Sequence, residues 1–422
     1  MIVLNDEQQE AFDLAVNGIS LFIDGSGGCG KSTVLKKVAD HFQAERKSCV
    51  LCAPTGIAAV NIGGMTIHRS FNLKPWQTTF AHYKEKKNSR TFTSSICILK
   101  ELDVLIIDEI SMVSADLFTL MDQIARYERG RYNEAFGGLQ VLIFGDFYQL
   151  PPIIKDKSGR TYAFETNTWK ELGLQTIQLT KVMRQQDGTF AQQLNHLRKG
   201  VVDDDLLPLF HAAQSLDLAT DHLRLECVNA DKDAINSKAF AELEGEPYIY
   251  RARYTGGPNA KELLQGCNAP DSLALKPGCP VLHLANSNGL CNGSFGVVID
   301  PAPDFFNNRT GPLVQVDGKE IEIKSYEWSI NDHKGRKMAS KSQIPLMLAW
   351  SVSIHRSQGQ TLDKVQVNLS KVFAKGQAYV ALSRVKSKDG LKIIGTQKKT
   401  KTQIKNMFSV DPLVDEFYAN LS

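Results

Sequence analysis

The chain has 422 residues, with 49 Lys and Arg against 46 Asp and Glu, so its net charge is only +3. A content of 42% hydrophobic and 23% charged residues is ordinary for a globular protein and excludes a disordered or collagen-like chain. No apolar run reaches the roughly 18 residues of a membrane span and no secretory signal opens the chain, so we expect a soluble intracellular protein of two to four domains, with no membrane partner.

Between residues 21 and 183, short apolar runs alternate with segments of helical apolar spacing. Residues 21–25, 49–54, 103–109 and 139–146 are typical of short buried strands, and residues 31–42 of a helix. Strands that are apolar on both faces, with helices between them, predict a parallel sheet covered on both sides. The polar, basic and aromatic stretch 72–94 interrupts this pattern and predicts a small surface insertion.

A second α/β pattern begins near residue 191. Residues 223–230 and 279–285 have the pattern of strands in another sheet, and the parallel pattern resumes at residues 345–359. Between them, residues 313–324 alternate on either side of Asp317 and Gly318, which predicts a β-hairpin and hence a small β module.

The eight cysteines are scattered, and one pair has the spacing of a metal or redox motif. Cys49 and Cys52 form a C-x-x-C, but no second pair supplies the further ligands of a zinc site. Because the segment also has the pattern of a buried strand, we expect core cysteines.

The strongest local motif is GSGGCGKS, which lies between an expected strand and an expected helix. It matches G-x-x-x-x-G-K-[ST], the P-loop, whose glycines let backbone N–H groups turn toward phosphate oxygens. Lys31 is expected to reach the β- and γ-phosphates of ATP, and the Ser32 hydroxyl to bind Mg²⁺. The residues expected to bind the nucleotide here are Gly25, Ser26, Gly27, Gly28, Cys29, Gly30, Lys31, Ser32 and Thr33.

The run DVLIIDEIS ends an apolar strand with Asp108 and Glu109. At the end of that strand Asp108 is expected near Ser32, as the second protein ligand of Mg²⁺. Glu109 beside it is expected to orient and deprotonate a water, which makes ATP hydrolysis the predicted reaction. A kinase would need an acceptor site, for which the sequence has no signal.

Three further residues complete the expected catalytic set. Gln149, in GDFYQLPP, follows the next strand and is expected to sense the γ-phosphate. Arg184 and Arg384 fall outside the P-loop sheet or at its end, and arginines presented across a domain cleft stabilise charge on the γ-phosphate. Taken alone, each arginine is more often an ordinary surface residue, and the two gain meaning only beside the other motifs. Gln377 and Arg384, seven apart, are expected on one helix face.

Together these motifs resemble the Pif family (petite integration frequency) of superfamily-one, type B DNA helicases, from about residue 4 to residue 385. The resemblance rests on LNDEQQEAF, APTGIAA, MTIHRSF, IHRSQGQTLDKV, QAYVALSR and the signature stretch EISMVSADLFTLMDQIAR. Cys29 departs from the family, whose P-loop more often has Thr or Ala there. Without long extensions, the chain resembles a minimal helicase core.

The resemblance implies an α/β fold with two RecA-like parallel-sheet motor domains. They are expected at residues 1–70 with 96–186, and at residues 187–297 with 342–422. A wedge insertion is expected at residues 71–95 and a small SH3-like, barrel-like β module at residues 298–341. The implied activity is ATP-dependent, 5′-to-3′ translocation on single-stranded DNA that unwinds duplex or structured DNA in replication, repair, recombination or telomere maintenance.

The resemblance also nominates binding residues. Gln8 is expected to read adenine, and Gly359 to contact the nucleotide. A stepping motor must hold a nucleic-acid backbone without reading bases, so amides, hydroxyls and rings suit it. The residues expected to contact DNA are Pro54, Thr55, Gly56, His68, His355, Ser357 and Gln358.

In the insertion, aromatic residues lie beside lysines, and two interpretations stay open. These residues press on a duplex fork, or they form a small hydrophobic core. They are Trp76, Phe80, His82, Tyr83, Lys84, Lys86 and Lys87.

The expected partners are single-stranded and forked duplex DNA, bound by a protein that is monomeric in solution. The expected location is the cytoplasm of a prokaryote, or the nucleus or mitochondrion of a eukaryote. Two alternatives remain: a related superfamily-one motor of the RecD-like kind, and a nucleotide-switched DNA-binding ATPase that does not unwind. A second sheet with arginines toward the cleft argues against the switch.

Overall fold

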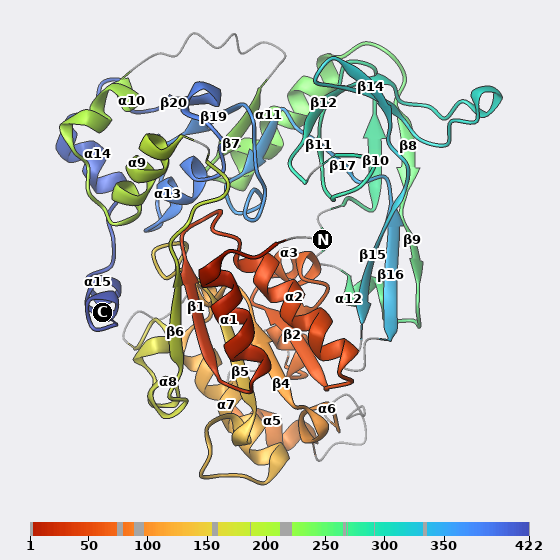
Figure 1. Ribbon diagram of the computed structural model, residues 1–422. Coiled ribbons are helices and arrows are strands. Elements are labelled where there is room, and N and C mark those ends of the chain that lie inside the picture. Colours follow the sequence, from red (N-terminus) through yellow and green to blue (C-terminus); the bar gives the residue numbers. More distant parts are fainter. Residues whose placement is uncertain are drawn as a thin grey trace.

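The computed structural model describes residues 3–73, 79–87, 97–153, 159–185, 187–211, 222–264, 267, 269–290, 292–331 and 336–421. In this part of the chain, the strands form sheets of six, two, five, three and four strands. The six-stranded sheet lies at the bottom of Figure 1, the four-stranded sheet above it at the left, and the antiparallel strands above it at the right.

The six-stranded sheet has the order β3-β2-β4-β5-β1-β6, and all its pairs are parallel. Its strands are β1 (Leu21–Gly25), β2 (Cys49–Ala53), β3 (Met65–Thr66), β4 (Val104–Ile107), β5 (Gln140–Gly145) and β6 (Gln175–Leu179). The four buried strands expected from the sequence are therefore confirmed. Because side chains alternate along a strand, Phe22 joins one apolar cluster, whereas Leu21 and Ile23 join another on the opposite face.

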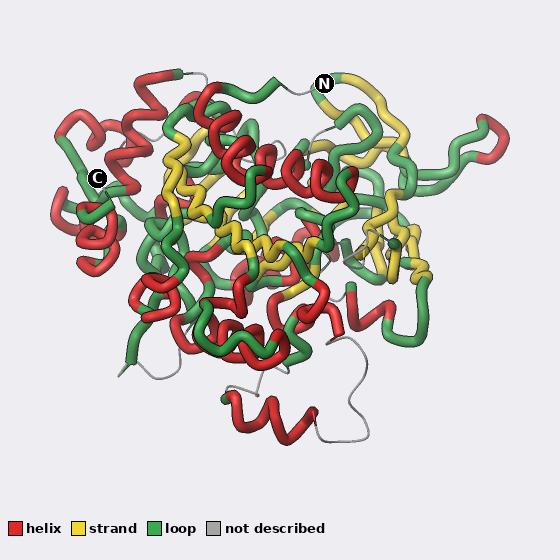
Figure 2. The backbone as a smooth tube through the Cα atoms, turned by 60° about the horizontal axis from the view of Figure 1, so that its bottom comes forward, coloured by secondary structure: helices red, strands yellow, loops and turns green. Residues whose placement is uncertain are grey.

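Helices cover both faces of this sheet (Figure 2). The helices α1 (Asp6–Val16) and α2 (Lys31–Ala44) pack on one face, and α7 (Ala115–Arg129) packs on the other. The remaining helices of this body are α3 (Gly56–Asn61), α4 (Ile67–Ser70), α5 (Phe80–Lys87), α6 (Cys97–Glu101) and α8 (Asn167–Glu171), with 3₁₀ turns η2 (Ile110–Met112), η3 (Ala135–Gly138) and η4 (Ala163–Glu165).

A second parallel sheet has the order β18-β7-β19-β20. Its strands are β7 (Leu223–Glu226), β18 (Ser351–Ser353), β19 (Val365–Asn368) and β20 (Leu391–Ile394). The helices of this body are α9 (Gly188–Arg198), α10 (Leu207–His211), α11 (Asn229–Glu242), α13 (Gln377–Leu382) and α14 (Lys401–Met407), with η5 (Asp204–Leu206) and η7 (Lys388–Gly390). The fold is thus α/β with two RecA-like parallel-sheet domains, as expected.

The other strands are antiparallel. A five-stranded sheet, β14-β13-β12-β11-β17, contains β11 (Pro280–His283), β12 (Phe295–Asp300), β13 (Leu313–Val316), β14 (Lys319–Glu322) and β17 (Leu346–Leu348). The hairpin predicted around Asp317 and Gly318 is confirmed, since β13 and β14 pair there. The expectation for residues 279–285 was only partly right: they form a strand, β11, but it lies in this sheet and not in the second parallel one.

Two smaller sheets flank the five-stranded sheet. The strands β9 (Arg253–Thr255), β15 (Tyr326–Asn331) and β16 (Lys337–Gln343) form an arm that descends beside the first domain, where β15 contacts α3 (Figure 1). The strands β8 (Tyr248–Arg251) and β10 (Ser272–Leu275) pair with each other, and α12 (Ala260–Leu263) packs on β16. A loop with the turn η6 (Phe305–Asn307) projects from the body (Figures 1 and 2).

In the expected wedge insertion, the described aromatic residues form a small core. Tyr83 is 1% exposed, and its hydroxyl donates to Glu128 of α7 at 2.9 Å. The Phe80 ring lies against Tyr127, and the Lys84 ammonium lies 4.7 Å from the Phe80 ring centroid. These contacts favour the mini-core. Trp76 and the side chains of Lys86 and Lys87 lie outside the described residues, so contact with a fork stays a prediction.

The last helix of the described chain, α15 (Pro412–Ala419), leaves the second domain and packs on the first (Figure 1), where Phe417 lies against Trp169 of α8. Within the described ranges, no helix combines the length and apolar character that a bilayer crossing demands.

Cys49 and Cys52 lie on β2, and burial raises the pKa of the Cys49 thiol to about 12. Cys52 is fully buried there, as expected for a core cysteine.

Candidate active site

The P-loop joins β1 to α2 and closes on positive φ angles. Gly28 has φ +94° and Gly30 has φ +88°, a region in which glycine is at ease. A Cβ at Gly28 would lie 2.6 Å from the Cβ of Arg184, so close packing also requires a glycine at position 28. The loop is therefore shaped both by its own backbone and by a residue more than 150 positions later.

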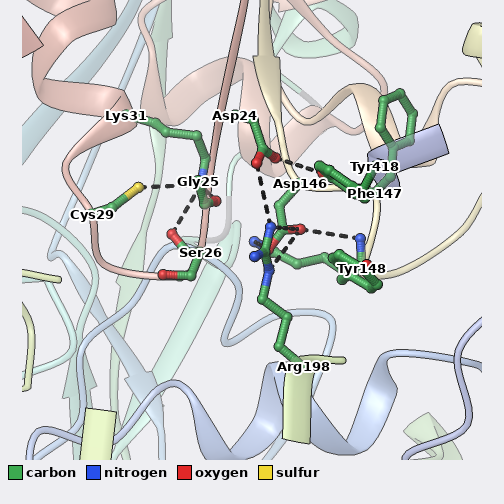
Figure 3. Close-up of polar contacts among 12 residues, drawn as sticks. Asp24, Gly25, Ser26, Cys29, Lys31, Asp146, Phe147, Tyr148, Arg198 and Tyr418 are labelled. Carbon is green, nitrogen blue, oxygen red and sulfur yellow. Dashed lines mark hydrogen bonds and ion pairs between the residues drawn. The ribbon is translucent and has the colours of Figure 1, made fainter. Parts of the chain in front are cut away.

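The Lys31 ammonium folds back over this loop (Figure 3). It donates to the carbonyl oxygens of Gly25 at 2.5 Å and Ser26 at 3.1 Å, and lies 3.8 Å from the Cys29 sulfur. Burial works against its charge, but Cys29 and the carboxylates of Asp146 and Glu109 outweigh burial and raise the pKa of Lys31. The loop thus holds a cation at the place where a P-loop binds phosphate.

Asp108 and Glu109 follow directly after β4. Asp108 accepts a hydrogen bond from the Glu109 backbone N–H at 2.9 Å, and Glu109 itself has φ +53°. Burial, together with the neighbouring Glu109, raises the pKa of Asp108 to about 7. Burial also raises the pKa of Glu109, whose Oε2 has no hydrogen-bond partner among the described residues. The raised pKa of both groups shows that nearby positive charge does not fully stabilise their ionised forms. A divalent cation bound beside them would supply that charge.

Gln149 lies in the loop after β5, in a buried position. Its Nε2 donates to Asp146 Oδ2 at 3.2 Å, and Asp146 Oδ1 also accepts the backbone N–H of Tyr148 at 3.1 Å. Asp146 therefore fixes both the backbone and the side chain of the segment in which Gln149 lies.

Arg384 is buried, and Arg184 is half-buried where it lines the cleft between the domains. Arg184 donates to the Ser383 carbonyl oxygen at 2.8 Å and to Thr361 Oγ1 at 3.1 Å. Burial, followed by the nearby Arg384, lowers the pKa of Arg184 to about 9. Burial also lowers the pKa of Arg384, against the opposing effect of Glu109. The two guanidinium groups thus lie near each other, and Arg184 lies beside the P-loop.

One detail of the Arg384 prediction is wrong. The helix α13 ends at Leu382, so Gln377 and Arg384 do not share a face of one helix. Arg384 instead lies in the turn after the helix and donates from Nε to the Val380 carbonyl oxygen at 2.8 Å.

Gln8 reaches the P-loop, and Gly359 lies near the helix α3. Gln8 Nε2 donates to the Cys29 carbonyl oxygen at 3.0 Å, and its Oε1 accepts from the Asn5 backbone in a capping box at the start of α1. Gly359 has φ +77° and faces Asn61 of α3. A Cβ on Gly30 would collide with Gln8 Nε2 at 2.3 Å, so the two residues fit closely.

A cleft of about 1070 Å³ lies between the two parallel-sheet domains and the β15 arm. One group of lining residues comes from the P-loop side: Ser32, Thr33, Asp108, Glu109 and Arg184. Another comes from the residues expected to contact DNA: Thr55, His355 and Gln358. Gly359, expected to contact the nucleotide, also lines the cleft. Tyr326 and Trp328 of β15 complete this wall. The structure therefore brings part of the expected nucleotide residues and part of the expected DNA residues to one space.

The expected DNA residues are not all equally available. Thr55 Oγ1 caps α3 by accepting the Ala58 N–H at 3.2 Å, and the Ser357 hydroxyl donates to the Ile354 carbonyl oxygen at 2.8 Å. Gln358 Nε2, by contrast, has no hydrogen-bond partner among the described residues. Pro54, Gly56, His68 and Ser357 do not line the cleft itself. Burial lowers the pKa of both His68 and His355.

Comparison with curated proteins gives consistent relatives. A family model described as PIF1-like helicase matches residues 3–205. The human protein named ATP-dependent DNA helicase PIF1 is 35% identical over 428 residues, which cover 99% of this chain and 64% of the human one. The protein named ATP-dependent DNA helicase Pif1 from Psychrobacter is 32% identical over 92% of this chain and 68% of its own length. This chain belongs to the Pif1 helicase family.

Solved structures of Pif1 helicases match the whole chain. The Candida albicans Pif1 helicase has 35% identity and a TM-score of 0.73, with 100% of both chains covered. The Bacteroides Pif1 in complex with ADP-AlF4 has 29% identity and a TM-score of 0.82, covering 100% of this chain and 97% of that one. The Bacteroides Pif1 bound to single-stranded DNA has 30% identity, a TM-score of 0.66 and the same coverage. The chain spans less than two thirds of the length of the human and Candida curated Pif1 relatives, at 64% and 56%.

Sequence reasoning missed five residues that surround the site of this Pif1-family chain. The Tyr379 hydroxyl oxygen accepts the Gly27 N–H at 3.1 Å. Asp24, Arg198 and Tyr418 form a buried cluster with Asp146 behind the P-loop (Figure 3). Arg198 and Tyr418 lie far from every nucleotide motif in the sequence, and only the fold brings them there. Asp24, a charged residue inside an apolar strand, was the one visible signal.

Proposed function

We propose that this chain is an ATP-dependent DNA helicase that moves 5′ to 3′ on single-stranded DNA and unwinds duplex or forked DNA. The observation that carries the proposal is the shared cleft, where Asp108 and Glu109 on one wall face the same space as His355 on another. When nucleotide and strand occupy one cleft, closure around the first changes the grip on the second. Membership of the Pif1 family and the complexes of its Bacteroides member support the proposal.

Lys31 has the first role in nucleotide binding. Its ammonium is held by two neutral carbonyl oxygens, of Gly25 and Ser26. Charged phosphate oxygens form stronger hydrogen bonds than carbonyl oxygens, so the ammonium would transfer to the β- and γ-phosphates as ATP enters. The P-loop amides from Gly27 to Thr33 would complete the phosphate contacts, and Gln8 would lie near the adenine.

The acidic pair fits a magnesium ion. The elevated pKa of Asp108 and the unpartnered Oε2 of Glu109 both mark buried negative charge without compensation. Ser32 and Asp108 would hold the ion, which when bound supplies positive charge to the phosphates. The chemistry of hydrolysis would otherwise come from the side chains of Glu109, Arg184, Arg384 and Gln149.

Glu109 would act as the general base. It would accept the proton of the attacking water as the water oxygen bonds to the γ-phosphorus and the bond to the leaving ADP oxygen breaks. Burial raises the pKa of Glu109 while Lys31 and Arg384 lower it, and a carboxylate with a raised pKa is the stronger base. Arg184 and Arg384 would stabilise the charge on the transferring group, and Gln149 would report whether the γ-phosphate is present.

DNA contacts would come from both motor domains. Pro54, Thr55, Gly56 and His68 belong to the first domain, and His355, Ser357 and Gln358 to the second.

The domain boundaries are part of the proposal. The first motor domain would comprise residues 1–70 with 96–186, and the second residues 187–297 with 342–422. The wedge insertion would comprise residues 71–95, and the small β module residues 298–341. The β strands of residues 298–341 divide between two sheets, one shared with β11 and β17 and one with β9. The protein would act as a monomer.

The test is steady-state ATP hydrolysis with Mg²⁺, with and without single-stranded DNA, beside Lys31→Ala. Strong stimulation by the strand and loss of turnover in the variant are expected. Duplexes with a 5′ or a 3′ single-stranded tail then test the direction of unwinding. Turnover that DNA leaves unchanged would favour a nucleotide-switched binding protein, and full activity of Lys31→Ala would refute the assignment of the P-loop.

A further inference from the structure

The chain crosses between the two motor domains a second time, near its end. Phe408, after α14, packs on Phe210 in the second domain with ring centroids 5.4 Å apart. Four residues later α15 begins, and its Val414 and Phe417 join the apolar core of the first domain. The Phe417 ring lies 4.3 to 6.0 Å from four aromatic rings of that domain, those of Phe22, Phe147, Phe164 and Trp169.

At the end of this helix, the Tyr418 hydroxyl joins two loops of the candidate active site (Figure 3). It donates to Asp24 Oδ1 at 2.5 Å and accepts the Phe147 N–H at 3.1 Å. Asp24 directly precedes Gly25, where the P-loop begins, and Phe147 lies two residues before Gln149. One hydroxyl therefore ties the end of β1 to the loop that follows β5.

A second side chain enters the same cluster from the other domain. Arg198 ends α9, whose Phe190 and Leu194 lie in the core of the second domain. Its guanidinium donates three hydrogen bonds to the Asp146 carboxylate at 2.8 to 3.1 Å and lies 3.5 Å from Asp24. It also lies 4.8 Å from the ring centroid of Tyr148 and 5.6 Å from that of Tyr418.

The cluster leads directly to the γ-phosphate sensor. Asp146, held by Arg198, accepts the Gln149 side chain. Asp24, Asp146 and Arg198 are buried and Tyr418 is half-buried. A buried carboxylate that loses its partner is strongly destabilised. A displacement of α9 or α15 would therefore make Asp24 or Asp146 move, and the P-loop start or Gln149 would move with it.

We propose that Arg198 and Tyr418 are positioning residues for ATP hydrolysis, which transmit the placement of the second domain to the P-loop and to Gln149. Their side chains contact Asp24 and Asp146, and through these carboxylates they act on the two loops, so they are positioning residues and not catalytic ones. This inference rests on the proposed function, because it assigns the two residues a role in the proposed ATPase reaction. Under this proposal, α15 contributes to the rate of ATP hydrolysis as well as joining the two domains.

The test compares two tyrosines that both bond across the α15 interface. Tyr418→Phe removes the hydroxyl that reaches Asp24 and Phe147, whereas Tyr162→Phe removes one that donates to Asp411 at 3.3 Å and touches neither loop. Both rings stay in place, so both variants should fold and lose a similar amount of thermal stability. Only Tyr418→Phe should lower kcat, by about tenfold, as expected for a hydrogen bond to a charged group, with KM for ATP unchanged.

Arg198 gives an independent second series. Arg198→Met should lower kcat more than Tyr418→Phe does, because it removes the positive charge beside the buried carboxylates of Asp24 and Asp146. Arg198→Lys restores one charge without the bidentate geometry and should recover part of the rate. A purely structural role predicts instead that kcat of all variants follows their melting temperature.

The outcomes separate this inference from the proposed function. Equal kcat for Tyr418→Phe, Tyr162→Phe and the unaltered protein would overturn the inference and leave the ATPase standing. An unaltered protein without DNA-stimulated turnover would overturn the proposed function, and amide hydrogen exchange then decides the inference. Tyr418→Phe must speed exchange at residues 25–33 and 146–149 more than Tyr162→Phe does; equal exchange would refute the positioning role.

Discussion

Glu109→Gln should separate nucleotide binding from hydrolysis. The substitution keeps the side-chain volume and removes the proposed base, which contributes about 10²- to 10⁴-fold to a rate, or roughly 2.7 to 5.4 kcal/mol of barrier. We expect kcat to fall by that factor. Binding of ATP should be kept, because Glu109 raises the pKa of Asp108 and its loss leaves Asp108 more readily ionised.

The same change should stabilise the protein in Mg²⁺-free buffer, with a defined pH dependence. The pKa of Glu109 is raised on folding, so the folded state binds more protons than the unfolded state above about pH 4.5, and stability falls as the pH rises. Glu109→Gln removes the ionisable group and with it this decrease in stability at high pH. Its gain in free energy of unfolding should be present at pH 8 and vanish toward pH 4.

The assay is single-turnover hydrolysis with saturating single-stranded DNA, together with a fluorescent-nucleotide titration and urea unfolding at both pH values. Glu128→Gln is the matched control, since Glu128 is a buried glutamate on α7 that accepts the Tyr83 hydroxyl, away from the cleft. A Glu109→Gln chemical step within threefold of the unaltered rate would refute the role of Glu109 as base. A variant less stable at pH 8 would refute the electrostatic argument.

Three more changes follow from the geometry. Gly28→Ala should weaken nucleotide binding and turnover, because its Cβ would lie 2.6 Å from the Cβ of Arg184; Gly63→Ala, also at positive φ but with open space around it, controls for backbone strain alone in the same assays. Arg184→Lys should lower kcat about tenfold or more with little change in KM, since lysine cannot bond Ser383 and Thr361 together. Burial lowers the pKa of His355, so it is neutral at pH 7, and a DNA phosphate would raise that pKa again. DNA affinity should therefore tighten from pH 8 to pH 6 and do so less in His355→Gln; a pH-independent affinity measured by fluorescence anisotropy would contradict this contact.

The first domain was predictable because its strands are short, apolar on both faces and separated by helices. Residues 21–25 and 104–107 read directly as buried strands, and both lie in the parallel sheet. The second half was harder to read. Residues 280–283 carry the same apolar pattern, yet they pair antiparallel, because strand direction depends on the neighbours and not on the strand's own composition.

The site divides in the same way. Lys31, Ser32, Asp108 and Glu109 lie in contiguous motifs, so sequence spacing alone placed them at one end of one sheet. Arg198 and Tyr418 lie in segments without a motif, and their roles depend on the return of α15 to the first domain. Long-range contacts of this kind leave no local pattern in the sequence.

Because α15 packs on the first domain, that domain cannot complete its apolar core until the end of the chain has been synthesised. The first sheet is complete once β6 has emerged from the ribosome, but Val414 and Phe417 follow about 230 residues later. At 5 to 20 residues per second, roughly 10 to 50 seconds pass in between. Through that interval Phe22, Phe147 and Trp169 lack their final aromatic neighbour. The nascent P-loop domain therefore has an uncovered apolar patch until α15 packs on it.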